Sequence, residues 1–192
     1  MTDLNKPLIQ GEKAPDAKRR GEGVPGRKRA NLPEAKLLEF AELLFFAYRD
    51  FTGDPDAILK HFGFGRAHHR VLHFVNRQPG LKIAEILAIL QITKQSLGRV
   101  LRELLDTGYI EVRPGPVDRR QRLLFPTAKG RKLALDLARL QSKRFARVFE
   151  GLPPGAYDQA VRFLLEMIDP GDRGAIAERL RLSSLSPERQ RA

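Results

Sequence analysis

The stretch from Thr93 to Thr127 limits the fold more than any other, because it joins an amphipathic helix directly to a basic hairpin. Thr93 is a predicted N-cap, since its hydroxyl can accept an orphan backbone N–H of the first helical turn. The apolar residues that follow recur every three or four positions and form one stripe, made of Leu97, Val100, Leu101, Leu104 and Leu105. Gly108 is predicted to end this helix, 93–107, from the C′ position.

The opposite face of the same helix is polar and cationic. It consists of Lys94, Gln95, Ser96, Arg99 and Arg102, and none of these residues is acidic. A helix that exposes Lys, Gln, Ser and Arg can enter the major groove of duplex DNA and contact base edges. The face that begins at Thr93 is therefore a candidate surface for reading DNA.

A basic hairpin follows the helix. Segments 109–112 (YIEV) and 122–125 (RLLF) are predicted short strands, and two prolines and a glycine turn the chain between them, at 113–121 (RPGPVDRRQ). A hairpin tip that carries arginines suits the minor groove, whose negative potential attracts guanidinium groups. Helix and hairpin together predict a winged helix-turn-helix, mainly α with a small β wing, and duplex DNA as its partner.

Composition is consistent with a polyanionic partner but does not select DNA. The 192 residues carry a formal net charge of +12 and a pI near 10.5, a balance shared by RNA-binding and membrane-surface proteins. The absence of cysteine excludes structural disulfides, thiolate-ligated zinc, a cysteine nucleophile and a thiol redox switch. No apolar run approaches the roughly 18 residues of a membrane span, and the N-terminus lacks a signal-peptide core. We therefore expect a cytoplasmic protein with no membrane partner.

The chain divides into three predicted regions. Residues 1–32 are expected to form a disordered basic arm, because few apolar residues offset the entropy of ordering it. A solvated tail is the first interpretation of this arm, and a DNA contact is the alternative. Residues 33–169 are the predicted winged helix-turn-helix domain with dimerisation helices, its DNA-binding core at about 66–126. Residues 170–192 are a C-terminal extension, partly disordered, with a short helix over 175–182.

Five further helices are predicted in the middle region. They cover 33–51, 66–77, 82–90, 127–150 and 156–168, and segment 53–65 is expected to be irregular with a short turn of helix at Asp56–His61. The first of them is apolar over much more than one stripe, and two more hydrophobic helices follow the hairpin. A DNA-binding module needs less apolar surface than this, so we predict a homodimer formed through the N- and C-terminal helices.

The order of elements resembles the MarR family of bacterial transcription regulators over residues 34–168. The most specific match is the hairpin, which reads Asp118-Arg119-Arg120, then Leu123-Leu124, then Thr127-x-x-Gly130, with Pro126 where the family usually has Leu. Supporting matches are Arg70-Val71-Leu72, Pro79-Gly80-Leu81 and Gly108-Tyr109-Ile110. The resemblance implies a homodimer that binds a pseudo-palindromic operator. The bound dimer would act as a repressor if it blocks the polymerase, or it would assist the polymerase. It also implies that a small-molecule effector, often phenolic, binds between the dimerisation and DNA-binding regions and releases the DNA.

The resemblance also implies roles for single residues. Arg120 would enter the minor groove, and Asp118 would hold the hairpin through a salt bridge. A turn-forming residue is the alternative interpretation of Asp118, since Asp is favoured in turns. Gln95 and Arg99 would contact base edges, since Gln suits adenine and Arg suits guanine through paired hydrogen bonds. Phosphate contacts, which orient a protein without specifying a sequence, would come from Lys94, Ser96, Arg102, Arg119 and Arg122. For Arg113, a DNA contact and a surface charge at a strand end are equally consistent with its position.

No other constellation predicts a different chemistry. His69 and His73 have a metal-compatible i, i+4 spacing but no third ligand nearby in the sequence, so we expect no metal. His68 lies on the apolar face of its helix and is expected to be buried and hydrogen-bonded. The chain has no P-loop, dinucleotide loop or nucleophile elbow, so we predict no cofactor and no enzyme activity.

Two alternatives to a sequence-specific regulator remain open. One is a nucleoid or RNA-associated protein that uses its charge without reading sequence. The other is an interaction module in which the helix-turn-helix has become a protein-docking surface. Competition between the preferred site and random duplex distinguishes the first alternative, because specific binding exceeds non-specific binding by at least about 10³-fold.

Overall fold

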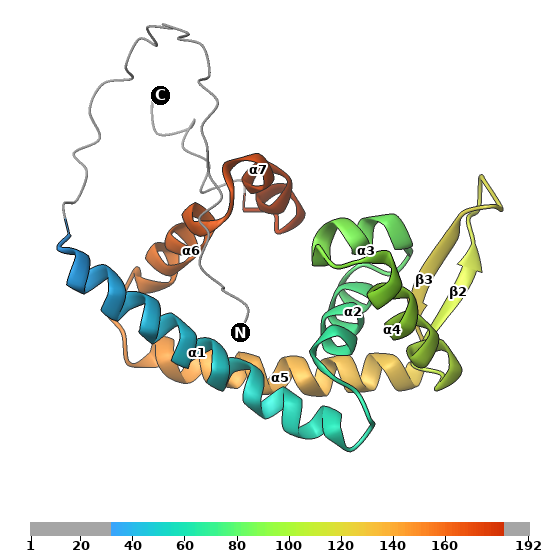
Figure 1. Cartoon of the computed structure of the whole chain (residues 1–192), viewed down its shortest axis with the longest axis horizontal. Coiled ribbons are helices and arrows are strands. Elements are labelled where there is room, and N and C mark those ends of the chain that lie inside the picture. Colours follow the sequence, from blue (N-terminus) through green and yellow to red (C-terminus); the bar gives the residue numbers. More distant parts are fainter. Residues whose placement is uncertain (1–31, 183–192) are drawn as a thin grey trace, which may run out of the picture. The chain divides into compact units, whose positions relative to one another are not determined.

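The computed structural model in Figure 1 describes residues 32–182. The predicted basic arm therefore lies outside the described residues except for Leu32, and so does the end of the C-terminal extension. Residues up to Glu39 form one unit and those from Phe40 onward form another. The second unit contains nearly all the elements described below.

Within the described range the chain forms helices α1 to α7 and strands β1 to β3. The helices are α1 (Glu34–Lys60), α2 (Arg66–Arg77), α3 (Ile83–Leu90), α4 (Lys94–Asp106), α5 (Ala128–Glu150), α6 (Ala156–Met167) and α7 (Pro170–Arg179). The strands are β1 (Leu81–Lys82), β2 (Ile110–Pro114) and β3 (Arg122–Pro126). The expected mainly α fold with a small β wing is confirmed.

Helix α1 is longer than predicted, because it continues through Pro55 to Lys60. The expected turn of helix at Asp56–His61 is confirmed up to Lys60, but it is part of α1 and not a separate turn within an irregular segment. A proline inside a helix removes one backbone donor and crowds the preceding turn, a cost of about 3 kcal/mol. Burial compensates here: Thr52, Pro55 and Leu59 are all buried, and the Thr52 hydroxyl donates to the Tyr48 carbonyl at 2.9 Å.

The sheet has a third strand that the sequence did not suggest. Its antiparallel order is β1-β3-β2, with Leu81 opposite Leu124 and Ile110 opposite Pro126. The prediction of a helix beginning at Lys82 is off by one residue, because Lys82 pairs in β1 and then serves as the N-cap of α3. A strand of two residues is too short to show the alternation that identifies strands in a sequence.

The core lies where α2 meets α3, α4, the sheet and the first half of α5. Its fully buried side chains come from all of these elements and include Leu72, Val75, Ile86, Leu97, Leu104, Ile110, Leu124 and Leu137. Burying one such side chain contributes about 1.5–3 kcal/mol. This core holds the helix-turn-helix and the hairpin in a fixed relation (Figure 1).

Much apolar surface remains exposed on α1, the second half of α5 and α6. Phe45 on α1 is 72% exposed, and α6 contains no buried residue. Aromatic pairs join these helices within the subunit, Phe51 to Phe145 at 5.3 Å and Phe40 to Phe163 at 5.1 Å between ring centroids. Among the described helices none is both long and apolar enough to cross a membrane.

The C-terminal helix α7 begins earlier than expected. It starts at Pro170 and ends at Arg179, whereas the sequence predicted a helix over 175–182. Pro170 lies in the first turn, where the missing N–H of proline costs nothing. Gly171 and Gly174 lower the intrinsic helix propensity of that turn and concealed it in the sequence.

Candidate nucleic-acid interface

Helix α4 begins with the predicted cap. The Thr93 side-chain oxygen accepts the backbone N–H of Ser96 at 3.1 Å, and the Thr93 hydroxyl donates to the Ser96 hydroxyl at 2.9 Å. The turn before α4 has no glycine, and Gln91 takes the left-handed backbone conformation instead, with φ of 49°. The chain thus leaves α3 and enters α4 within three residues, which is the connection of a helix-turn-helix.

The two faces of α4 are as different as the sequence predicted. Leu97, Val100, Leu101 and Leu104 are buried, and Leu105 is half-buried. Lys94, Gln95, Ser96, Arg99 and Arg102 are all exposed. Their side chains, with the exception of Lys94, line a shallow hollow of about 620 Å³ over Gly98. Within residues 32–182 no carboxylate pairs with Lys94, Arg99 or Arg102, so the face carries three uncompensated positive charges.

The junction between α4 and the hairpin is tightly built. Gly108 has φ of +71°, and the Tyr109 N–H donates to the Leu104 carbonyl at 2.8 Å, which confirms the predicted helix end. The Thr127 hydroxyl at the start of α5 donates to the Gly108 carbonyl at 2.7 Å. A Cβ at Gly130 would lie 1.8 Å from the Tyr109 carbonyl oxygen, so only glycine permits this approach. These contacts fix the direction in which the hairpin leaves the helix.

The hairpin formed by β2, β3 and residues 115–121, called the wing below, has a closed tip. The Gly115 N–H donates to the Gln121 carbonyl and the Gln121 N–H donates to the Asp118 carbonyl, both at 3.0 Å. The Asp118 carboxylate accepts the backbone N–H of Arg120 at 2.9 Å. Of the two interpretations of Asp118, the structure agrees with the turn-forming one: its carboxylate stabilises the turn through the backbone and forms no salt bridge among the described residues. The side chains of Arg119 and Arg120 are left exposed and without a carboxylate partner in the part of the chain that is described.

The other two arginines of the wing differ from each other. Arg113 is held within the sheet: its Nε donates to Glu111 at 2.8 Å, and its guanidinium lies 4.5 Å from the centroid of the Phe125 ring. Arg122 is exposed and forms no ion pair among the described residues. Arg113 is therefore the one basic residue of the predicted set whose charge is already compensated inside the subunit.

A buried contact that the sequence did not reveal joins α2 to α4. His68 is buried as expected, its Nδ1 accepts the Gly65 N–H at 3.1 Å, and its ring stacks on Phe64. Its Nε2 lies 2.6 Å from the Glu103 carboxylate. Because Nδ1 accepts a hydrogen bond, the ring proton sits on Nε2 and is donated to Glu103. No local pattern relates residues 35 positions apart, so only the fold could show this partner.

A second cavity, of about 440 Å³, lies between α1, α2 and α5. Tyr48, Phe51 and Arg66 contribute to its wall, together with His69 and His73. Burial lowers the pKa of both histidines. The charge of Arg77 lowers the pKa of His73 further, and His73, when protonated, does the same to His69, which Asp56 partly opposes. Both rings are therefore neutral at neutral pH, and the cavity presents aromatic rings beside two guanidinium groups, those of Arg66 and Arg70. The Arg66 guanidinium is paired with Asp56 at 2.7 Å.

Comparisons with known proteins agree with this geometry. A model of the MarR family matches residues 62–121, which run from the end of α1 to the tip of the wing. The HTH-type transcriptional regulator PetP of Rhodobacter capsulatus is 43% identical over 152 residues, 79% of this chain and 92% of that protein.

Two solved structures share the fold. Streptococcus pneumoniae FabT, crystallised in complex with DNA, gives a TM-score of 0.61 at 17% identity over 68% of this chain and 94% of that one. CouR of Rhodococcus jostii RHA1, bound to p-coumaroyl-CoA, gives 0.60 at 23% identity over 72% and 97%. At sequence identities this low, the similarity to these two structures shows a shared fold and nothing more. The capped helix, the wing and the extended identity to PetP lead to one conclusion: this chain belongs to the MarR family of transcriptional regulators.

Proposed function

We propose that this regulator binds a pseudo-palindromic operator in duplex DNA as a homodimer, with α4 in the major groove and the wing in the adjacent minor groove. The observation that carries the proposal is the set of uncompensated positive charges on two adjoining elements. Lys94, Arg99 and Arg102 on α4, and Arg119, Arg120 and Arg122 in and beside the wing tip, take part in no ion pair among the described residues. Phosphates of a duplex would neutralise such charges and release the counterions that surround the DNA.

We propose a separate role for each exposed side chain. Gln95 and Arg99 stand on the first turns of α4 and would contact base edges. Arg120 would occupy the minor groove from the wing tip. Phosphates would be contacted by Thr93, Lys94, Ser96, Arg102, Arg119 and Arg122. Asp118 shapes the tip, and Arg113, already paired with Glu111, contributes little.

The exposed apolar faces of α1 and α6 support the homodimer. Phe45 is 72% exposed and Leu164 is 56% exposed, and large apolar side chains rarely stay in water over so continuous a surface. A second copy of the chain supplies the same surface in return, as a two-fold interface requires. Two recognition helices would then meet half-sites about one helical turn, about 34–36 Å, apart.

The cavity between α1, α2 and α5 supports a small-molecule effector. It lies between the helices proposed for dimerisation and the helix-turn-helix, and its aromatic walls suit an aromatic carboxylate. The cation for that carboxylate would be Arg70, because Arg66 is already paired with Asp56. A ligand there would bias the angle between the two halves of the subunit and so the spacing of the recognition helices. Titrating p-coumarate and benzoate into the protein–operator complex tests this, and an operator affinity unaffected by either would count against aromatic carboxylates as the effector class.

Substitution of Arg120 by Ala tests the function directly. Operator duplexes are first selected from genomic DNA by the unmodified protein, and binding is then measured by fluorescence anisotropy at several salt concentrations. R120A should weaken binding by about 1–3 kcal/mol per half-site and reduce the salt slope by about 2, because one inserted cation is lost from each subunit of the dimer. The matched control is R113A, which removes an arginine from the same wing that is already paired within the sheet and should change affinity little.

The same assay separates the alternatives. A sequence-specific regulator prefers its selected site over random duplex by at least about 10³-fold at fixed salt. Equal affinity for both duplexes would favour a nucleoid-associated protein, and the absence of binding to either would favour a protein-docking module. R120A binding the operator as tightly as the unmodified protein would show that the wing is not inserted.

A further inference from the structure

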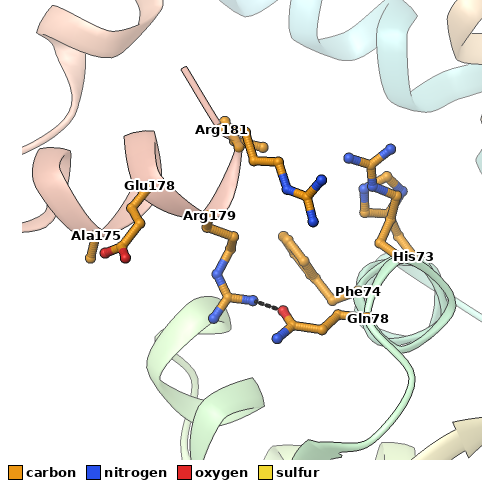
Figure 2. Close-up of a pocket in the computed structure, with 9 residues that line it drawn as sticks. His73, Phe74, Gln78, Ala175, Glu178, Arg179 and Arg181 are labelled. Atoms are coloured by element: carbon orange, nitrogen blue, oxygen red, sulfur yellow. Dashed lines mark hydrogen bonds between the residues drawn. The ribbon is translucent and has the colours of Figure 1, made fainter. Parts of the chain in front are cut away.

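A cleft between α2 and α7 lies apart from the α4 face and from the wing. Its volume is about 710 Å³, and α2 supplies His73, Phe74, Arg77 and Gln78 to its wall. Helix α7 and the residues just after it supply two more arginines, Arg179 and Arg181. Figure 2 shows Arg181 directed into the cleft over Phe74, with Arg179 beside Gln78.

The cleft gathers positive charge without a counter-charge. Arg77, Arg179 and Arg181 form no salt bridge with any residue of the described range. The acidic residue in the wall is Glu178, and its carboxylate points away from Arg181 in Figure 2. Like charges gathered in this way repel one another, and a bound anion relieves the repulsion.

The backbone holds these arginines in position. Arg181 follows the end of α7 with φ of 55°, a left-handed conformation that costs a residue other than glycine about 1–2 kcal/mol. Two hydrogen bonds fix it there: the Arg181 N–H donates to the Glu178 carbonyl and the Leu182 N–H to the Ala177 carbonyl, both at 2.9 Å. This is the Schellman cap, in which glycine is the usual occupant of the position that Arg181 takes.

Side-chain contacts tie α7 to the helix-turn-helix. An Arg179 nitrogen donates to the Gln78 side-chain oxygen at 2.8 Å, and the Gln91 amide donates to Asp172 at 3.3 Å. Arg179 is therefore oriented by a neutral partner that leaves its charge intact. The remaining donors of its guanidinium, and those of Arg77 and Arg181, are available to a ligand.

From these observations we propose that the cleft binds a small oligoanion, a molecule with two or more carboxylate or phosphate groups. Guanidinium groups bind both kinds of oxyanion through paired, charge-assisted hydrogen bonds. Phe74 offers an apolar surface for a short carbon backbone between the anionic groups. The cleft shares His73 and Phe74 with the wall of the proposed effector cavity, but its other wall comes from α7, which lies outside the segment that the family model matches.

Calorimetric titration of the full chain, without DNA, tests the proposal. Two probes are used separately, inorganic pyrophosphate for the phosphate class and citrate for the carboxylate class. Saturable binding of either at one site per chain is the expected result, and their relative affinities identify the preferred class. Because DNA is absent, failure here leaves the proposed operator binding untouched.

The decisive variant is Arg181→Gly. It removes one guanidinium and puts glycine, which adopts positive φ without strain, at the left-handed position of the cap. The melting temperature should therefore be unchanged or higher. Loss of charge-assisted hydrogen bonds should weaken probe binding by about tenfold or more. The control R139Q removes the same charge from the surface of α5 and should leave binding within about twofold.

Three results would overturn the proposal. The first is the absence of saturable binding for both probes. The second is an equal effect of R181G and R139Q, which would mean general attraction to a basic protein. The third concerns DNA: if R181G weakens operator binding as much as R120A does when no small anion is present, the cleft serves the DNA backbone instead.

Discussion

Arg99 and Arg120 come from different elements, and each presents a guanidinium to solvent without a carboxylate partner in the described part of the chain. Arg113, only seven positions before Arg120, is bound to Glu111 and lies over Phe125. Residue type alone therefore does not decide which arginines are available to DNA. The partner inside the subunit decides it, and that partner becomes visible only once the strands pair.

Loss of the Arg99 side chain should change the base preference of the protein, whereas loss of the Arg120 side chain should change its overall affinity for DNA. An arginine that contacts a guanine edge discriminates among bases by about 1–3 kcal/mol, whereas a minor-groove or phosphate contact affects many sequences alike. R99A is therefore expected to relax preference at one position in each half-site of the operator. Binding to a set of single-base operator variants measures this, and a uniform loss across all variants would instead place Arg99 on the phosphates.

His69 and His73 give the protein a pH-dependent stability. Burial holds the pKa of each ring below its usual value, so the unfolded chain binds more protons than the folded one as the pH falls. Their contribution is present above the usual histidine pKa of about 6.5 and is lost as the pH drops through the lower folded values. Melting temperatures between pH 7.5 and 5 should fall, and less so in the variant H73Q. A flat profile down to pH 5 would mean that both rings already accept protons in the folded state.

At the scale of elements, local patterns predicted most helices but not their long-range contacts. Thr93 and Thr127 accept helix N–H groups as cap residues should, and Gly108 ends α4 as expected. The extension of α1 through Pro55, the strand β1 and the His68–Glu103 hydrogen bond were missed. Each depends on tertiary packing, either burial that offsets a helix breaker or a partner tens of residues away.

The candidate interface follows the same division. The identities of its exposed residues on α4 could be derived from helical periodicity alone, since the apolar stripe fixes which face is left outside. The geometry of the wing could not be derived from the sequence, because the hydrogen bonds of a turn depend on the conformation of several consecutive residues. Asp118 illustrates this: the sequence was consistent with either a salt bridge or a turn-forming role, and only the folded turn shows its carboxylate accepting a backbone N–H.

Two helical glycines provide a matched test of how α4 and the wing are joined. A Cβ at Gly130 would overlap the Tyr109 carbonyl at 1.8 Å, whereas nothing lies within 4 Å of a Cβ at Gly98. G130A should destabilise the fold by about 1–3 kcal/mol through overpacking. G98A should stabilise it by about 0.5–1 kcal/mol, because alanine favours the helix. Urea unfolding measures both, and similar stabilities for the two variants would contradict the close approach of α5 to β2.

At the scale of the whole molecule, the proposed operator recognition would use two copies of the subunit. The exposed apolar residues on α1 and α6 are the surfaces that we propose to meet. Sedimentation or light scattering should report a dimer for the unmodified protein. The substitution Phe45→Glu should shift it to a monomer, because it places a charge in the proposed interface. V117E adds the same charge at a wing-tip residue that is 98% exposed and should remain dimeric. A dimer that persists in F45E would place the interface elsewhere.

In the proposed complex, α4 and the wing occupy neighbouring grooves of one duplex. The composition of the chain allows this placement to be tested directly. Because it contains no cysteine, one introduced cysteine can carry a DNA-cleaving iron–EDTA group at a single chosen position. Arg102→Cys labels α4 and Val117→Cys labels the wing tip. On a selected operator, the α4 probe should cut across the major groove of each half-site, and the wing probe across the flanking minor groove. Cleavage by both probes in the same groove, or evenly along the duplex, would contradict the account.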